Sequence, residues 1–219
     1  MKLLLTSGGI TNDSIKRALT DLLPKPIAEC NALACSTSSY AMANGAQMAQ
    51  NFYNPNGTSN MTNLGWQQLG VLELTALPSI GVEIWQQQLR ETDVLLVNGG
   101  DPLYLNHWMK TSGVAEFLPS LDHLVYVGLS AGSMIMTPRI GADFVGWQQP
   151  DGTDTTLGLV DFSIFPHLDH PHLTENTRAA AVEWSKTLGN DAYAIDEDTA
   201  IQVVDGQVQI ISEGNWRKF

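Results

Sequence analysis

The sequence has few of the features that mark secreted, metal-binding or membrane proteins. Its 219 residues include only two cysteines, Cys30 and Cys35. Their spacing is typical of neither a metal site nor a redox pair, so we expect both to be reduced. The apolar run at residues 3–5 is too short for a signal segment, and no other stretch approaches the roughly 18 apolar residues of a membrane helix. We therefore expect a cytoplasmic protein with no membrane partner.

Positive charge is also scarce. The chain has 11 Lys and Arg residues against 23 Asp and Glu residues, which gives a formal net charge of −12 at pH 7. Because such a surface repels phosphate groups, nucleic acid is not an expected partner. The sequence contains neither a G-x-G-x-x-G motif nor a P-loop, and these are the usual indications of a nucleotide. We expect no cofactor.

The rest of the composition is that of a globular protein. Hydrophobic residues make up 43% of the chain and charged residues 16%, values that exclude a disordered or collagen-like protein. A chain of this length is most simply one compact domain, and no linker or repeat interrupts it. We expect residues 1–219 to form a single domain that is a monomer or a homodimer.

The pattern of apolar segments predicts an α/β fold. Short apolar strands are expected at residues 1–6, 67–77, 93–97 and 123–127, and helices at residues 13–23, 80–89 and 174–188. Because continuously apolar strands alternate with helices, we predict a mostly parallel sheet covered by helices on both faces. A long loop is expected at residues 137–162. The chain should end in short strands at residues 192–195, 200–204 and 207–211, with a hairpin turn at Asp205-Gly206.

The clearest motif is Gly-Leu-Ser-Ala-Gly at residues 128–132, which matches G-x-S-x-G. Small residues around the serine allow a sharp turn from strand to helix, and this turn exposes the hydroxyl. A strand is expected before the motif and a helix after it, which is the context that the motif requires. Ser130 is therefore predicted to be a nucleophile, with the amide of Ala131 facing the substrate carbonyl oxygen.

A serine hydroxyl needs a base within hydrogen-bond reach and a third group that orients the base. Three of the five histidines, His167, His170 and His172, follow the apolar segment at residues 162–165. The sites of α/β proteins collect at strand ends, so we predict that His167 is the general base. A metal site in this histidine cluster is an alternative that no regular zinc spacing supports.

With these residues in place, the chain resembles the peptidase E family, which includes aspartyl dipeptidases and cyanophycinases. Four segments carry the resemblance: Asn-Gly-Gly at 98–100, Gly-Leu-Ser-Ala-Gly at 128–132 followed by Pro138, Phe-Pro-His at 165–167, and Ala-Ile-Asp-Glu-Asp-Thr-Ala at 194–200. The resemblance is close over the C-terminal half of the chain, whereas the N-terminal half matches only in the order of its strands. The resemblance implies a serine peptidase with a flavodoxin-like or class I glutamine amidotransferase-like sheet.

The resemblance also implies roles for individual residues. Gly99 and Gly100 match the loop that adds a backbone N–H to the oxyanion hole, beside the amide of Ala131. Two carboxylates stay open as the third member of the triad: Glu197 near the C-terminus, and Asp143 shortly after the serine. To serve in the triad, either carboxylate has to face the imidazole N–H of His167.

The substrate implied by the family is a short peptide with an N-terminal aspartate, or an aspartyl-arginine polymer. A pocket for aspartate needs a cation, and Arg139 and Arg178 are the nearest candidates by position, since a guanidinium can bind a carboxylate bidentately. An ordinary surface salt bridge is the alternative for each arginine. The acidic composition argues against long-range attraction of acidic peptides.

Two other functions stay open on the sequence. A small α/β esterase would use the same elbow in the order Ser130, Asp143, His167, although the chain lacks an H-G-G-G oxyanion motif. A non-catalytic protein that binds a small molecule on a flavodoxin-like sheet would not need a reactive serine.

Overall fold

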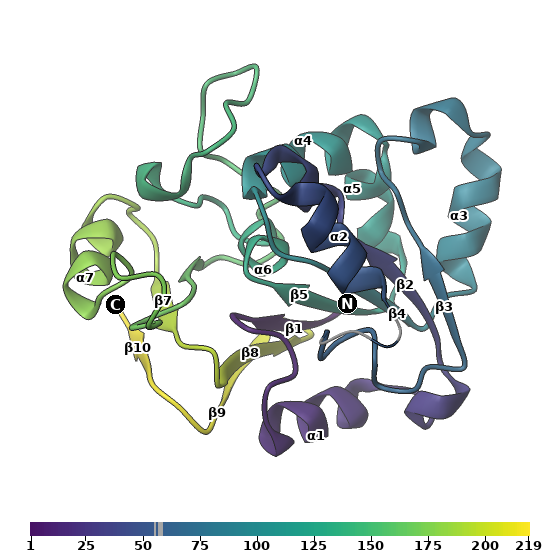
Figure 1. Ribbon diagram of the computed structural model, residues 1–219, viewed down its shortest axis with the longest axis horizontal. Helices are drawn as coiled ribbons and strands as arrows, with labels where there is room; N and C mark the ends of the chain where they lie inside the picture. Colours follow the sequence, from purple (N-terminus) through teal and green to yellow (C-terminus); the bar gives the residue numbers. More distant parts are fainter. Residues whose placement is uncertain (55, 57–58) are drawn as a thin grey trace.

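The computed structural model describes residues 1–54, 56 and 59–219. Its main element is a seven-stranded sheet with the strand order β3-β2-β4-β5-β1-β8-β9 (Figure 1). The first five strands in the chain are parallel where they pair, and β8 and β9 are antiparallel additions at one side. The strands are β1 Lys2–Thr6, β2 Asn31–Cys35, β3 Gln68–Val71, β4 Val94–Val97, β5 Val125–Leu129, β8 Thr199–Val204 and β9 Gln207–Ser212.

Helices cover both faces of this sheet, as the sequence predicts. Helices α1 and α2 contribute to the buried cluster on one face, and α3, α4 and α5 to the cluster on the other. The α-helices are α1 Asp13–Leu22, α2 Gly45–Tyr53, α3 Val82–Arg90, α4 Pro102–Thr111, α5 Val114–Phe117, α6 Ala131–Met134 and α7 Arg178–Lys186. Short 3-10 turns lie at Ile27–Glu29, Thr37–Ala41, Leu77–Ser79, Leu118–Ser120 and Ala142–Phe144.

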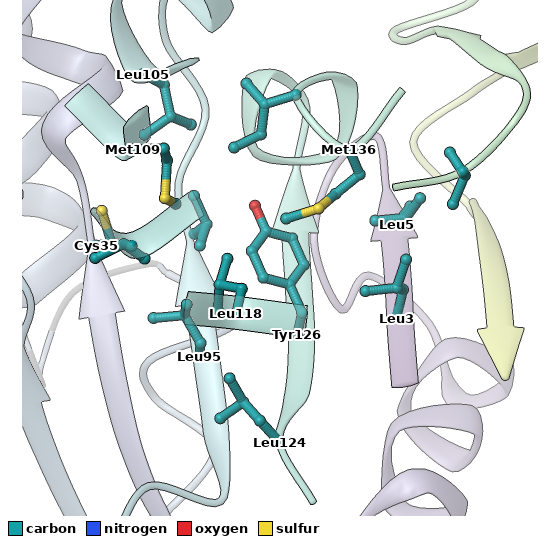
Figure 2. Packing of buried hydrophobic residues seen from close by; sticks show 14 of the residues in the cluster. Leu3, Leu5, Cys35, Leu95, Leu105, Met109, Leu118, Leu124, Tyr126 and Met136 are labelled. Carbon is teal, nitrogen blue, oxygen red and sulfur yellow. The ribbon is translucent and has the colours of Figure 1, made fainter. Parts of the chain in front are cut away.

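The central strands are apolar on both sides because both sides are buried. On β1, Leu3 and Leu5 belong to one buried cluster and Leu4 to the other. Figure 2 shows Leu3, Leu5, Leu95 and Tyr126 extending from neighbouring strands into the same cluster. Successive side chains of a strand point to opposite faces, so a strand covered on both faces reads as a continuous apolar run.

A second, three-stranded sheet lies beside the first, at the left of Figure 1. It consists of β6 Ser163–Phe165, β7 Ala192–Ile195 and β10 Trp216–Lys218, with β7 in the middle. Helix α7 packs on it through Ala181 and Trp184, which share a buried cluster with Phe165. The chain passes from β7 of this small sheet directly into β8 of the main sheet.

Some predicted element boundaries were wrong. The strand β2 was not predicted, because Asn-Ala-Leu-Ala-Cys has no β-branched or aromatic residue. The strand expected at residues 67–77 ends at Val71, and the helix expected at 174–188 begins only at Arg178, where the Thr177 side chain caps it by accepting from Ala180 N–H.

Other expectations agree with the structure. Asp205 and Gly206 both have positive φ and join β8 to β9 in a hairpin. Residues 137–162 form a long loop with a single isolated bridge between Arg139 and Thr155. Cys30 and Cys35 are buried and free, and burial raises the pKa of the Cys35 thiol to about 11. No helix among the described residues has both the length and the apolar character of a membrane span. The assignment of residues 1–219 to one domain stays a prediction.

Candidate active site

The predicted nucleophile lies at the carboxyl edge of the main sheet. Strands β1, β4 and β5 are neighbours, and they end at Thr6, Val97 and Leu129. Because these strands are parallel, the segments that follow them meet at one edge. Ser130 directly follows β5, so it is the first residue beyond the sheet.

The backbone at Ser130 has the sharp turn that the motif predicts. Its φ is 50° and its ψ is −111°, a conformation that side-chain-bearing residues rarely adopt. The turn is tight enough that a Cβ atom on Gly128 would lie 2.6 Å from the backbone carbon of Gly132. A Cβ atom on Gly132 would in turn collide with the carbonyl oxygen of Val97. Glycine is therefore required on both sides of the serine.

Buried hydrogen bonds hold this elbow to the sheet. The N–H of Ser130 and the hydroxyl of Ser133 both donate to the carbonyl oxygen of Thr6, at 3.0 and 2.8 Å. The hydroxyl of Tyr126 donates to the carbonyl oxygen of Gly132 at 2.6 Å. Burial raises the pKa of the Tyr126 phenol well above its usual value, so it remains a proton donor.

The structure places His167 against Ser130. The distance from His167 Nε2 to Ser130 Oγ is 2.8 Å, and the distance from His167 Nδ1 to Glu197 Oε1 is 2.5 Å. The side chain of His167 is 20% exposed and that of Glu197 is 33% exposed, so solvent reaches the far end of this chain of contacts. A hydroxyl, an imidazole and a carboxylate in sequence form the arrangement that activates a serine for attack on a carbonyl.

The small sheet explains why Glu197 reaches the histidine. Strands β6 and β7 pair in parallel, with Phe165 opposite Ala194. The residues that follow each strand, His167 and Glu197, therefore leave the sheet at the same edge. Strand pairing thus joins two side chains that are 30 residues apart in the chain, and no local spacing in the sequence reveals this contact.

Asp143, the alternative third member, lies elsewhere. It is an exposed residue of the turn Ala142–Phe144, and within the described part of the chain it makes no hydrogen bond or ion pair. Its neighbour Phe144 lines a cavity with Ser130 and His167, but the carboxylate at His167 Nδ1 is that of Glu197. The structure brings Glu197, and not Asp143, to His167.

Sequence reasoning missed Ser7, which also positions His167. The backbone N–H of His167 donates to Ser7 Oγ at 2.7 Å, and the same oxygen lies 3.3 Å from His167 Nδ1. His167 has a positive φ of 58°, an unusual conformation that this contact helps to fix. Ser7 follows β1 just as Ser130 follows β5, and the turn Ser7-Gly8-Gly9 after the first strand was the available signal.

The predicted oxyanion donors lie beside the serine. A Cβ atom on Gly99 would be 3.3 Å from the Cβ of Ser130, so the loop after β4 touches the elbow. Within the described residues, the N–H groups of Gly99, Gly100 and Ala131 have no hydrogen-bond partner. Unpaired amides next to a nucleophile are available to a carbonyl oxygen that gains negative charge.

Buried serines anchor the loop that carries these glycines. The hydroxyl of Ser38 donates to the carbonyl oxygens of Asn98 and Gly99, at 3.0 and 2.8 Å. The side-chain amide of Asn98 donates to Ser36 Oγ at 2.8 Å. Gly100 has a φ of 139°, and a Cβ there would lie 2.5 Å from the Ser38 carbonyl. The 3-10 turn Thr37–Ala41 therefore fixes where the Gly99 and Gly100 amides lie.

The two arginines predicted to bind substrate each form an ion pair within the chain. Arg139 pairs with Asp154 at 3.1 Å and donates to the carbonyl oxygen of Leu188, which ties the long loop to the end of helix α7. Arg178 pairs with Asp169 at 2.9 Å on the surface. Neither lines a cavity that contains Ser130 or His167. A role for either arginine in binding an N-terminal aspartate therefore stays a prediction.

Two cavities flank the elbow. One, which we call the apolar cavity, has a volume of about 280 Å³ and includes Ser130 and His167 in its wall. Its other lining residues are Met42, Gly100, Asp101, Pro102, Met134, Phe144, Gly146, Pro166, Leu173 and Asn176. The other, the amide cavity, has a volume of about 310 Å³ and is lined by Gly8, Met48, Asn51, Phe52, Ser59, Asn60, Asn98 and Leu129.

Comparison with known proteins agrees with the resemblance seen in the sequence. A family model described as peptidase family S51 matches residues 3–211. Two curated proteins, both described as uncharacterized peptidases, are 31% identical to this chain. The one from Pasteurella multocida matches over 134 residues, 57% of this chain and 61% of its own length; the one from Listeria monocytogenes matches over 122 residues, 52% and 58%. The match thus spans about three-fifths of each relative.

Solved structures confirm the fold. A crystal structure described as a putative peptidase E protein from Listeria monocytogenes has a TM-score of 0.65 and 20% identity, and the match covers 97% of this chain and 98% of that one. A peptidase from an acI-B1 actinobacterium has a TM-score of 0.64 and 15% identity, with 100% and 93% covered. At these identities the likeness supports the α/β fold and carries no information on substrate.

Proposed function

The chain belongs to peptidase family S51, a family of serine-type peptidases, and we propose that it hydrolyses short peptides through a triad of Ser130, His167 and Glu197. The observation that carries this proposal is the line of contacts from Ser130 Oγ to His167 Nε2, at 2.8 Å, and from His167 Nδ1 to Glu197 Oε1, at 2.5 Å. The first distance is typical of a hydrogen bond, and the second is shorter than the usual range. The strained backbone at Ser130 is a second support, since such strain is typical of functional sites.

The proposed reaction proceeds by acyl transfer. Ser130 Oγ attacks the peptide carbonyl carbon while His167 Nε2 accepts the hydroxyl proton, and the carbonyl oxygen becomes an oxyanion near the amides of Gly99, Gly100 and Ala131. When the C–N bond breaks, His167 gives its proton to the leaving amine. Water, deprotonated by the same imidazole, then attacks the acyl-enzyme and releases the acid and the free serine.

Glu197 would act on the imidazole and not on the substrate. A carboxylate at Nδ1 accepts the N–H of that nitrogen, so Nε2 carries the lone pair that faces Ser130. The same carboxylate stabilises the imidazolium that forms when His167 holds the serine proton. Ser7 supports this orientation through the backbone of His167.

The size of the site suits short peptides. Cavities of about 280 and 310 Å³ lie on the two sides of the elbow, and each has room for one or two side chains. A preference for N-terminal aspartate is a finer prediction that rests on the family resemblance alone. A cytoplasmic location, a monomeric or homodimeric state and the absence of nucleic-acid and membrane partners are likewise proposals.

The proposal predicts that Ser130→Ala abolishes peptide hydrolysis. We expect kcat/KM to fall by about 10³-fold or more, because only binding and oxyanion stabilisation would remain. A fluorophosphonate probe should label the wild type at Ser130, and peptide mapping by mass spectrometry would locate the label. Ser120→Ala is the matched control, since Ser120 is an exposed serine that lines neither cavity.

Two results would contradict the proposal. If the folded wild type stayed unlabelled and hydrolysed no peptide, a non-catalytic binding role would explain the elbow better. If the enzyme hydrolysed acyl esters far faster than every peptide tested, with Ser130 still required, an esterase would be the better description.

A further inference from the structure

The apolar cavity indicates which side chain the site accepts. Six apolar side chains line it: Met42, Pro102, Met134, Phe144, Pro166 and Leu173. Met134 is 2% exposed and forms a fixed part of the wall, whereas Met42 and Leu173 are 42% and 43% exposed at the rim. A concave surface of this composition gains free energy by removing apolar groups from water, and methionine adapts to differently shaped partners.

The charged residues around the site also favour an uncharged substrate side chain. Among the described residues that line the apolar cavity or the amide cavity there is no Lys or Arg. The apolar cavity does contain Asp101, which is 5% exposed and accepts the backbone N–H groups of Tyr104 and Trp147 at 2.9 and 2.6 Å. No lysine, arginine or histidine forms an ion pair with Asp101 in the part of the chain that the structure describes. A second carboxylate placed here would lose hydration and meet a like charge.

The side chain that occupies this cavity belongs to the acyl half of the substrate. During the reaction the acyl group is bonded to Ser130 Oγ, and Ser130 lines the apolar cavity but not the amide cavity. The residue whose carbonyl is attacked must therefore place its side chain next to this wall. In a dipeptide, that residue is the N-terminal one.

We infer that the site selects peptides whose N-terminal residue has an uncharged, apolar side chain, such as Leu or Met, and discriminates against N-terminal aspartate. The inference rests on the proposed function, because it assigns a substrate class to the same serine. It differs from what the family resemblance implies, because the arginines that could have bound aspartate are held elsewhere: Arg139 by Asp154, and Arg178 by Asp169.

The test is a set of dipeptides with alanine in second place and Leu, Met, Asn or Asp in first place. Asn and Asp have nearly the same shape, so the ratio of kcat/KM for Asn-Ala to that for Asp-Ala isolates the effect of charge. The ratio of kcat/KM for Leu-Ala to that for Asn-Ala reports the effect of burying an apolar side chain. We expect kcat/KM for Leu-Ala and Met-Ala to exceed that for Asp-Ala by at least about tenfold. We expect Asn-Ala to lie between them.

Two variants at the rim connect this preference to the cavity. Leu173→Arg places a cation at the apolar cavity, and Leu173→Gln changes polarity and shape without adding charge. Since Leu173 is 43% exposed, both variants should fold. We expect Leu173→Arg to raise the ratio of Asp-Ala to Asn-Ala turnover by about fivefold or more, as a new ion pair of about 1 kcal/mol would do. Leu173→Gln should leave that ratio unchanged.

The outcomes separate this inference from the proposed function. Hydrolysis that requires Ser130 but is fastest on Asp-Ala would overturn the inference and leave the peptidase intact; Arg178→Ala would then show whether a rearranged Arg178 supplies the cation. An unchanged ratio in Leu173→Arg would place the N-terminal side chain outside the apolar cavity and would also overturn it. A wild type that hydrolyses no peptide and resists the fluorophosphonate probe would overturn both.

Discussion

The serine half and the histidine half of the site are held in different ways. Ser130 extends from the main sheet, and backbone groups of the core hold its elbow: the carbonyl of Thr6 accepts two hydrogen bonds, and Gly132 packs on the backbone of Val97. His167 follows the small sheet, and side chains from two distant loops hold it, those of Ser7 and Glu197.

Because the two halves are held differently, substitutions in them should have different effects on stability and activity. The elbow is part of the packed interior, so disturbing it should lower the free energy of unfolding. The histidine is 20% exposed and depends on polar contacts at the sheet edge, so disturbing those contacts should lower activity while the fold persists. The following predictions test whether substitutions at the elbow mainly affect stability and substitutions around His167 mainly affect activity.

The largest effect is expected on the histidine side, from Glu197→Gln. An amide can present the wrong hydrogen-bonding group to Nδ1 and cannot stabilise the imidazolium, so kcat should fall by about 10²–10⁴-fold. Steady-state kinetics measures this, and circular dichroism should show an unchanged fold. Asp143→Asn is the matched control and should keep wild-type kcat, because the carboxylate that contacts the imidazole is that of Glu197. The reverse pattern would make Asp143 the orienting acid.

The next effect is expected on the serine side, from Gly132→Ala. The added Cβ would overlap the carbonyl oxygen of Val97, which is fixed in β4, so the free energy of unfolding should fall by about 2–3 kcal/mol. Urea denaturation measures this change. Gly81→Ala is the control, since the nearest atom to its Cβ would be a flexible Glu83 oxygen at 3.6 Å, and its stability should stay close to that of the wild type. Equal stability of the two variants would mean that the elbow is not tightly packed.

A smaller effect is expected from Ser7→Ala on the histidine side. Removing the hydroxyl leaves the N–H of His167 without its acceptor, so the ring should lose part of its alignment and kcat should fall by about three- to tenfold. KM should change little, because Ser7 is fully buried and lines neither cavity. A variant with an unchanged kcat would show that Glu197 alone orients the imidazole.

The smallest effect is expected from Tyr126→Phe on the serine side. This substitution removes one buried hydrogen bond to the carbonyl of Gly132 and keeps the ring in the core, so the free energy of unfolding should fall by about 1 kcal/mol. Activity well below the unfolding temperature should remain near that of the wild type. A large loss of activity with unchanged stability would contradict the division between the two halves.

The elbow was predictable from sequence because its requirements are local. Strand, turn and helix follow one another directly around Ser130, and the glycines at 128 and 132 are needed for contacts within that turn and with the adjacent strand. The continuous apolar runs likewise predicted a sheet buried on both faces, since a strand covered on both sides has no polar face. His167 was predictable as a polar residue at the end of a strand.

The partners of His167 were not predictable from sequence in the same way. Glu197 and Asp143 both met the chemical demand for a carboxylate, and only the parallel pairing of β6 with β7 distinguishes them. Ser7 contacts His167 across 160 positions of the chain. Arg139 and Arg178 met the demand for a cation, and only the structure shows that each is paired with an aspartate, Asp154 and Asp169 respectively.

The sequence by itself determined the fold class, the elbow with its serine, and the family. It did so because backbone sterics and apolar periodicity act between residues that are near in the chain. The tertiary structure decided which carboxylate meets the imidazole, how the oxyanion amides are anchored, and which side chains line the cavity beside Ser130. Those features depend on contacts between segments far apart in the chain, and such contacts exist only once the two sheets have packed together.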